Sequence, residues 1–269
     1  MTNNAPQSAV GIDIGGTGIK GAVVDLSTGE LLSERVKLPT PKGGEPKDIV
    51  QTVKQVLDSL SPAGDSLPLG VCFPAIVKNG MTMSAANVSD KWIGLEAEKL
   101  FEKGLGRDIQ FVNDADAAGY AETEFGAAKD RKGLTLLTTL GTGIGTALIY
   151  DHTLIPNAEL GHLEIDGHDA ETRASYAAKE RDDLSWDKWA KRLQKYYERL
   201  EFLLSPDLFV VGGGVSKHAD EFIPLLKLKT PIIPAVHRNN AGILGAAALA
   251  ARAGRPGREG ASAEAVHAG

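Results

Sequence analysis

Short apolar runs separated by glycine-rich turns fill the first part of the chain. The runs are rich in β-branched and aliphatic residues, and they predict strands at residues 9–14, 18–25, 30–38, 69–73 and 109–112. Between the third and fourth runs, apolar residues recur every three or four positions from Ile49 to Leu60, which is the period of an amphipathic helix. Pro46 suits the first position of that helix. This part of the chain therefore predicts strands with a helix packed against them.

The second half repeats this order. Two apolar runs, at 134–140 and 144–150, flank a second glycine turn and predict a hairpin. A long amphipathic helix follows at about 184–204, then a strand at 208–211 and an alanine-rich helix at 241–252. The aromatic residues of the long helix fall on one stripe, which is typical of core packing.

The repetition predicts an α/β protein of two similar lobes with a cleft between them. We expect a small lobe from residues 1–112 and 241–254 and a large lobe from 113–240. The segment 255–269 has few apolar residues and is predicted to be disordered.

Each predicted lobe carries a glycine-rich turn between two of its strands. Glycine lets the backbone approach a ligand and takes positive φ at little cost, so bare N–H groups can cradle phosphate oxygens. The residues predicted to hold phosphate are Gly15, Gly16, Thr17, Gly18, Lys20, Gly141, Thr142 and Gly143. Two matching turns indicate a duplicated scaffold that grips a phosphoryl donor from both sides.

Composition excludes several classes of protein. Hydrophobic residues make up 42% of the 269 residues and the net charge is −6, which argues against general nucleic-acid binding. The single cysteine, Cys72, lies in an apolar run, so no internal disulfide or cysteine-rich zinc site can form and a buried thiol is expected. No signal peptide is evident and no apolar run is long enough to span a membrane, so we expect a cytoplasmic protein.

Two acidic positions are candidates for chemistry. Asp13 ends the first strand beside the first turn, where a carboxylate can hold Mg²⁺ through water or can instead stabilise the turn. Asn113 and Asp114 stand where a strand runs into a helix, the edge at which α/β sheets bind ligands. Helix capping accounts for either Asn113 or Asp114, and Asp116 falls in the first helical turn, where the helix dipole favours a negative charge. A carboxylate here could also accept the proton of an attacking hydroxyl.

Glu159, His162 and Glu171 form a third candidate group. Their side chains could bond adjacent hydroxyls of a polyol, and they are also suitable for a metal. A structural zinc site usually adds thiolates, which this chain lacks, so sugar hydroxyls are favoured.

These motifs together resemble the ROK sugar kinases. The resemblance is carried by Asp13-Ile14-Gly15-Gly16-Thr17, by Asn113-Asp114-Ala115, and by Leu140-Gly141-Thr142-Gly143 followed by Glu159-Leu160-Gly161-His162. It covers about residues 9–252 and implies the actin-like, hexokinase-like (ribonuclease H-like) two-lobed fold. The first turn and the segment from Ser84 to Trp92 are similar to the polyphosphate glucokinase branch, which includes polyphosphate/ATP glucomannokinases.

The resemblance implies transfer of a terminal phosphoryl group from polyphosphate or ATP to the 6-hydroxyl of glucose, with mannose as a further candidate acceptor. It implies Asp114 as general base, Mg²⁺ oriented by Asp13, and a nucleotide base beside Gly213 and Gly214. The sugar ligands that it implies are Asn87, Asn113, Asp114, Glu159, His162 and Glu171. Many relatives carry a cysteine-rich zinc motif after the Glu-x-Gly-His segment; residues 163–170 contain no cysteine, so structural zinc is not expected.

Several alternatives stay open at this stage. A polyphosphate chain needs a basic track, and the candidates are Lys20, Lys129, Arg131, Lys132, Lys188, Lys191, Arg192 and Lys195, which could equally form an ordinary polar surface. An ATP-only hexose kinase and a non-catalytic sugar sensor are rival functions. A sugar-responsive repressor is disfavoured. Such regulators carry an N-terminal DNA-binding helix-turn-helix, and here the first strand is predicted to begin about ten residues from Met1. A monomer or a homodimer is expected, with no nucleic-acid or membrane partner.

Overall fold

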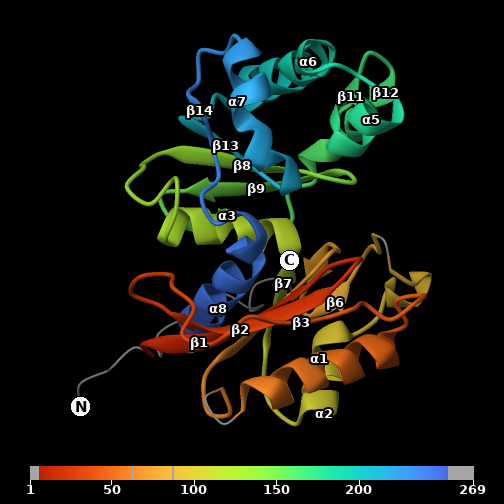
Figure 1. Cartoon of the computed structure of the whole chain (residues 1–269), viewed down its shortest axis with the longest axis vertical. Helices are drawn as coiled ribbons and strands as arrows, with labels where there is room; N and C mark the ends of the chain where they lie inside the picture. Colours follow the sequence, from red (N-terminus) through yellow and green to blue (C-terminus); the bar gives the residue numbers. More distant parts are fainter. Residues whose placement is uncertain (1–5, 62–63, 87, 254–269) are drawn as a thin grey trace, which may run out of the picture.

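The computed structural model describes residues 6–61, 64–86 and 88–253, and it contains two five-stranded sheets, one in each half of the molecule (Figure 1). The predicted tail at 255–269 and Asn87 lie outside the described residues. Each sheet contains one of the two predicted glycine hairpins, so the repetition in the sequence corresponds to two sheets of similar construction.

The first sheet has the order β3-β2-β1-β4-β7. Its strands are β1 (Ser8–Ile14), β2 (Ile19–Asp25), β3 (Val36–Leu38), β4 (Leu69–Phe73) and β7 (Gln110–Asn113). β1 and β2 are antiparallel, and β4 and β7 continue the sheet in parallel with β1. Parallel strands end at the same edge of a sheet, so Asp13 and Asn113 lie at one edge of the first sheet.

One predicted strand is too long. The sequence predicts a strand at 30–38, but the structure has only Val36–Leu38 and an isolated bridge at Leu31. The Ser33 hydroxyl accepts the N–H of Val23 at 3.0 Å, where a paired strand would offer a backbone carbonyl. A side chain therefore replaces the ladder at this point.

Two helices cover one face of the first sheet, and these are α1 (Pro46–Leu60) and α2 (Ala97–Leu105). The apolar stripe of α1 is buried, which confirms the predicted amphipathic helix. The core also contains Trp92, whose indole N–H donates to the carbonyl of Gly44 at 2.8 Å. A short hairpin lies beside this core, formed by β5 (Val77–Lys78) and β6 (Met81–Thr82).

The second sheet has the order β10-β9-β8-β13-β14. Its strands are β8 (Leu134–Leu140), β9 (Ile144–Tyr150), β10 (Thr153–Ile155), β13 (Leu208–Gly212) and β14 (Ile232–Pro234). The long helix α6 (Trp186–Leu204) packs on it through Trp189, Leu193 and Tyr197, which confirms core packing for the aromatic stripe. The smaller elements are β11 (Glu164–Ile165), β12 (His168–Asp169), α4 (Glu171–Ala174), α5 (Tyr176–Arg181) and α7 (Ala219–Phe222).

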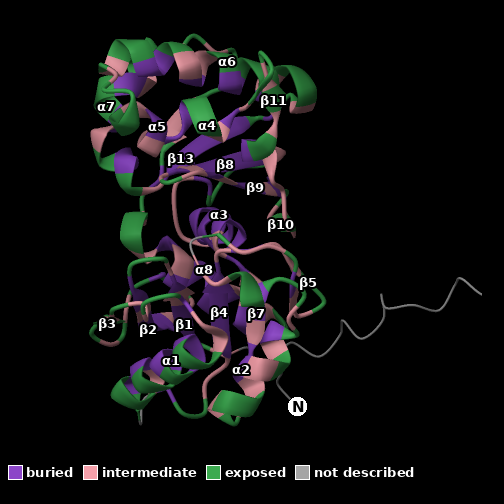
Figure 2. Cartoon of the chain, turned by 90° about the vertical axis from the view of Figure 1, so that its right-hand side faces the viewer, coloured by how far each residue is buried: buried purple, intermediate pink, exposed green. Residues whose placement is uncertain are grey.

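Two helices lie between the sheets, α3 (Asp114–Glu124) and α8 (Ala241–Ala253) (Figures 1 and 2). Their backbones nearly touch: a Cβ added at Gly245 of α8 would lie 1.7 Å from the carbonyl oxygen of Ala117. Gly11 of β1 is equally tight against Ile243, at 1.9 Å. This close packing fixes the start of α3, and hence Asp114, between the two halves. The predicted lobe boundaries, at 112/113 and 240/241, stay a prediction.

Candidate active site

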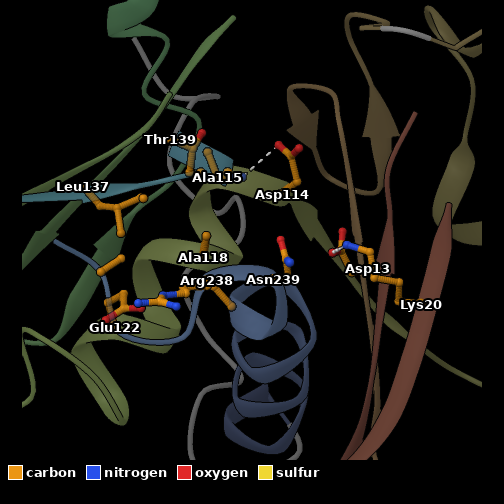
Figure 3. A pocket seen from close by; sticks show the side chains of 16 residues that line it. Asp13, Lys20, Asp114, Ala115, Ala118, Glu122, Leu137, Thr139, Arg238 and Asn239 are labelled. Atoms are coloured by element: carbon orange, nitrogen blue, oxygen red, sulfur yellow. Dashed lines mark hydrogen bonds and ion pairs between the residues drawn. The ribbon is translucent and has the colours of Figure 1, made fainter. Parts of the chain in front are cut away.

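A polar cavity of about 170 Å³ lies between the two sheets, where β1, β2, α3, β8 and the loop before α8 meet (Figure 3). Asp13 and Lys20 form one side and Glu122 and Arg238 lie on the other, with Asp114 between them (Figure 3). Gly213 and Gly214 also line the cavity. The structure thus brings together residues that the sequence singled out from three separate segments, at 13–20, 114 and 213–214.

Asp114 is positioned by its neighbours at the junction of β7 and α3. Asn113 caps the helix: its side-chain oxygen accepts the N–H of Asp116 at 3.0 Å, and its side-chain nitrogen donates to the carbonyl of Ala75 at 3.0 Å. The carboxylate of Asp114 accepts the N–H of Ala115 at 2.8 Å. Both ends of the buried Asn113 amide are therefore engaged within the protein, which leaves one N–H for a ligand.

The electrostatic environment raises the pKa of Asp114 to about 7. Burial is the largest cause, and the negative charge of Asp13 adds to it, with a smaller contribution from Glu159. A carboxyl with a pKa near neutrality can exchange a proton at the pH of a cell. Asp114 is thus suited to accept a proton from a bound hydroxyl.

Asp13 is held by the hairpin of the first sheet. It lies opposite Lys20 in the β1–β2 register, and the two side chains form an ion pair of 2.9 Å. Cys72 packs against it, fully buried, and burial raises the pKa of that thiol well above its usual value, which agrees with an inert cysteine. Asp13 and Asp114 share one cavity, and carboxylate oxygens are the ligands that a divalent cation prefers.

The two glycine turns are tight hairpin turns, as predicted. Gly15 N–H donates to the carbonyl of Gly18 at 3.1 Å, and Gly141 N–H donates to that of Gly143 at 3.0 Å. Gly16, Thr17 and Thr142 lie exposed at the tips. None of the turn residues is among those that line the 170 Å³ cavity, so the turns stand beside it.

Glu171 and His162 lie around the second turn. Glu171 accepts the N–H of Ile144 at 3.0 Å, and a side chain at Gly143 would collide with its carboxylate. His162 Nδ1 bonds Asp169 at 2.8 Å, which raises the pKa of the imidazole. Among the described residues, His162, Asp169 and Glu171 form a group whose ligand atoms all lie within 4.8 Å of one another. Asp169 was not predicted from the sequence.

Glu159 stands between these groups and Asp114. It is partly buried, burial raises its pKa, and its charge acts on Asp114 and on Asp116. Asp116 is more than the predicted first-turn charge: it is buried, its pKa is raised to about 7, and it accepts the N–H of Asn157 at 2.8 Å. Asp116 therefore positions the loop that leads to Glu159.

Glu122 and Arg238 were not predicted from the sequence. The buried carboxylate of Glu122 accepts the backbone N–H groups of Ala127, Val236 and His237 at 2.8–3.1 Å, which fixes the loop before α8. That loop presents Arg238, with a φ of 46°, and Asn239 to the cavity. The positive φ is uncommon for a residue other than glycine and here sits at the candidate site. The only local signal was an Arg-Asn-Asn run before an alanine-rich helix.

Comparison with known proteins matches residues 9–175 to the ROK family. The chain belongs to the ROK family. It is 47% identical over 238 residues to a polyphosphate glucokinase of Mycobacterium tuberculosis, an alignment covering 88% of this chain and 89% of the relative. The Mycobacterium leprae polyphosphate glucokinase is 45% identical, with 88% and 72% covered.

Solved structures agree with this assignment. The crystal structure of an inorganic polyphosphate/ATP-glucomannokinase from Arthrobacter sp. strain KM has a TM-score of 0.88 and 53% identity, covering 92% of this chain and 100% of that one. A ROK family glucokinase from Streptomyces griseus has a TM-score of 0.79 at 23% identity, covering 91% and 99%, which bears on the fold alone. The predicted two-lobed, actin-like fold is confirmed. No helix among the described residues is long and apolar enough to cross a membrane.

Proposed function

We propose that this protein transfers a terminal phosphoryl group from inorganic polyphosphate or ATP to the 6-hydroxyl of glucose, and also of mannose. The observation that carries the proposal is the half-buried Asp114, with its pKa near 7, in a cavity that also holds Asp13 and Lys20. The likeness to a polyphosphate glucokinase and to a polyphosphate/ATP-glucomannokinase supports the donor and the acceptors.

In the mechanism, Asp114 orients the 6-hydroxyl and accepts its proton as the oxygen attacks the terminal phosphorus. The terminal phosphoanhydride bond breaks, and the shortened polyphosphate, or ADP, leaves. Transition states of this kind are usually loose, so positioning and charge stabilisation supply most of the catalysis. Lys20 lies in the same cavity and brings positive charge to the transferred group. Its ion pair with Asp13 holds the ammonium in place before the donor arrives.

Kinases of this type use a divalent cation, and we propose Mg²⁺. Asp13 and Asp114 fit it, because the charge of one raises the pKa of the other and a cation relieves that repulsion. Asp13 would hold the ion through water. When bound, it supplies positive charge that neutralises the phosphate oxygens.

The sugar is proposed to lie against Asn113, Glu159, His162 and Glu171, together with Asn87. Asp169 orients the His162 ring through its Nδ1 bond and leaves Nε2 for a sugar hydroxyl. The turn residues Gly15 to Gly18 and Gly141 to Gly143 are proposed to hold the donor phosphates. For ATP, the base is proposed to sit beside Gly213 and Gly214, close to Arg238. A cytoplasmic location remains the prediction from the sequence.

The test is formation of hexose 6-phosphate from glucose with Mg²⁺ and nucleotide-free long-chain polyphosphate, run beside an ATP reaction. Product with polyphosphate supports the proposal in full. Product with ATP alone refutes the polyphosphate part and leaves an ATP-dependent hexose kinase. Absence of product with both donors, when glucose still binds in calorimetry, would instead identify a sugar sensor.

A further inference from the structure

A second cavity, of about 260 Å³, is lined by residues of α6 and of the segment that carries β11, β12 and α4. None of its lining residues lines the cavity that contains Asp114. Its floor is partly apolar, and its charged residues are four bases, Arg173, Lys191, Arg192 and Lys195, and one acid, Asp166. On a chain whose net charge is −6, this is a local excess of positive charge.

The bases are only partly neutralised. Arg192 pairs with Asp182 at 2.7 Å and Lys195 with Asp166 at 2.5 Å. Arg173 faces the ring nitrogen of His168 at 2.7 Å, and among the described residues it has no carboxylate partner. Lys191 likewise makes no ion pair within the described part of the chain, and Asp187, one turn earlier, is bonded to Ser185. The cavity therefore has positive charge available for an anion.

A buried hydroxyl also points to a missing ligand. Tyr196 lines the cavity and is 1% exposed, yet its hydroxyl has no hydrogen-bond partner among the described residues. A buried polar group without a partner costs free energy, and native proteins rarely leave one so. A ligand oxygen within reach of Tyr196 would supply the missing acceptor.

The positive charge continues beyond the cavity along α6. Five bases share one face of the helix at spacings of three or four residues, namely Lys188, Lys191, Arg192, Lys195 and Arg199. This stripe extends for about 16 Å at the rise of an α-helix. A line of charge of that length matches an extended polyanion better than a compact sugar phosphate.

We propose that this cavity and stripe bind a remote section of the inorganic polyphosphate chain whose end reacts in the cleft. The inference rests on the proposed function. The link between the two places is α4: Glu171, at its first position, bonds Ile144 beside the second glycine turn, and Arg173, two residues on, lines the cavity. A donor attached at two places binds more tightly than one attached only at its end. Long chains gain from the second attachment, and ATP and tripolyphosphate do not.

The test compares a double variant, Lys191→Gln with Lys195→Gln, with a control of equal charge, Lys54→Gln with Lys103→Gln. The control lysines are exposed on α1 and α2, at the other end of the molecule (Figure 1). The KM for long-chain polyphosphate is expected to rise about tenfold in the first variant, as two lost charge contacts would give. The KM values for ATP and tripolyphosphate, and all values in the control, are expected to stay within about twofold, since surface charges far from a site contribute little. Tyr196→Phe removes only the unpartnered hydroxyl. This variant is expected to raise the KM for long-chain polyphosphate and to leave the KM values for ATP and tripolyphosphate unchanged.

Direct binding separates this inference from the proposed function. Calorimetric titration of wild-type protein with long-chain polyphosphate is expected to give binding that the double variant weakens, whether or not the protein turns over. An unchanged KM and unchanged binding in the double variant would overturn the inference. An equal rise in the KM values for ATP and tripolyphosphate would also overturn it. So would a double variant that no longer binds glucose 6-phosphate, when wild type does, but still binds polyphosphate as wild type does.

Discussion

Asp114→Asn is expected to stabilise the folded protein while it abolishes most of the activity. The wild-type carboxyl is half-buried and feels the charge of Asp13, and its pKa rises from 3.8 to about 7 on folding. The folded state therefore binds this proton more tightly than the unfolded state does, and stability falls as the pH rises from 3.8 towards 7. Asparagine carries no charge and retains an oxygen that can accept the N–H of Ala115.

The magnitude follows from the pKa shift. About three pKa units correspond to roughly 4 kcal/mol at a pH above both values, which is an upper figure because local relaxation reduces it. Between pH 5.5 and pH 8.5, the loss of stability caused by ionisation of Asp114 grows by about 1.5 pKa units, or roughly 2 kcal/mol. The variant is thus expected to exceed wild type in free energy of unfolding, and by about 2 kcal/mol more at pH 8.5 than at pH 5.5.

Urea unfolding at these two pH values, without metal or substrates, measures the difference. Asp116, whose pKa is also raised, is present in both proteins and its contribution cancels. The control is Asp58→Asn, an exposed residue on α1 whose ion pair with Lys54 is worth at most about 1 kcal/mol. A variant no more stable than wild type at pH 8.5, or a stability difference independent of pH, would refute the proposed environment of Asp114.

Three further predictions concern the pH profile and the supporting residues. The kcat/KM is expected to rise with pH through an apparent pKa of about 7, because the ionised form of Asp114 accepts the proton; a profile flat from pH 5 to 8 would contradict this. Glu122→Ala leaves three part-buried N–H groups without their acceptor and is expected to lower the free energy of unfolding by about 2 kcal/mol in denaturant titration, whereas an unchanged value would show that the loop does not depend on it. Asp169→Asn removes the charge that stabilises the imidazolium of His162, so NMR titration is expected to show a lower pKa for this ring than in wild type, and an equal pKa would exclude the contact.

Much of the fold could be predicted because its signals are local. The two hairpins depend on glycine turns between apolar runs, and α1 and α6 depend on helical periodicity within a single segment. The strand at 30–38 was predicted too long, because the hydroxyl of Ser33, within that segment, accepts the N–H of Val23 in place of a backbone carbonyl. A propensity pattern does not contain such a contact.

The candidate site was predicted where chemistry and sequence neighbours coincide. Asp13 and Asp114 stand where two strands of the first sheet end, so their meeting at one edge of that sheet follows from the topology. Gly213 follows β13 of the second sheet and lines the same cavity. Glu122 and Arg238 were missed because their roles come from a contact across more than a hundred residues. The raised pKa of Asp114 likewise depends on desolvation and on the charge of the distant Asp13, which composition and spacing do not reveal.

Phosphoryl transfer from long-chain polyphosphate to glucose is the most direct test of the central claim, measured as glucose 6-phosphate formed by wild type and by Asp114→Ala in the presence of Mg²⁺. Wild type is expected to form product without any nucleotide, and the variant is expected to be slower by roughly 10²–10⁴-fold, the range for a positioned acid–base group. Turnover of the variant within about threefold of wild type would contradict the role given to Asp114, since that is far below the effect of losing such a group.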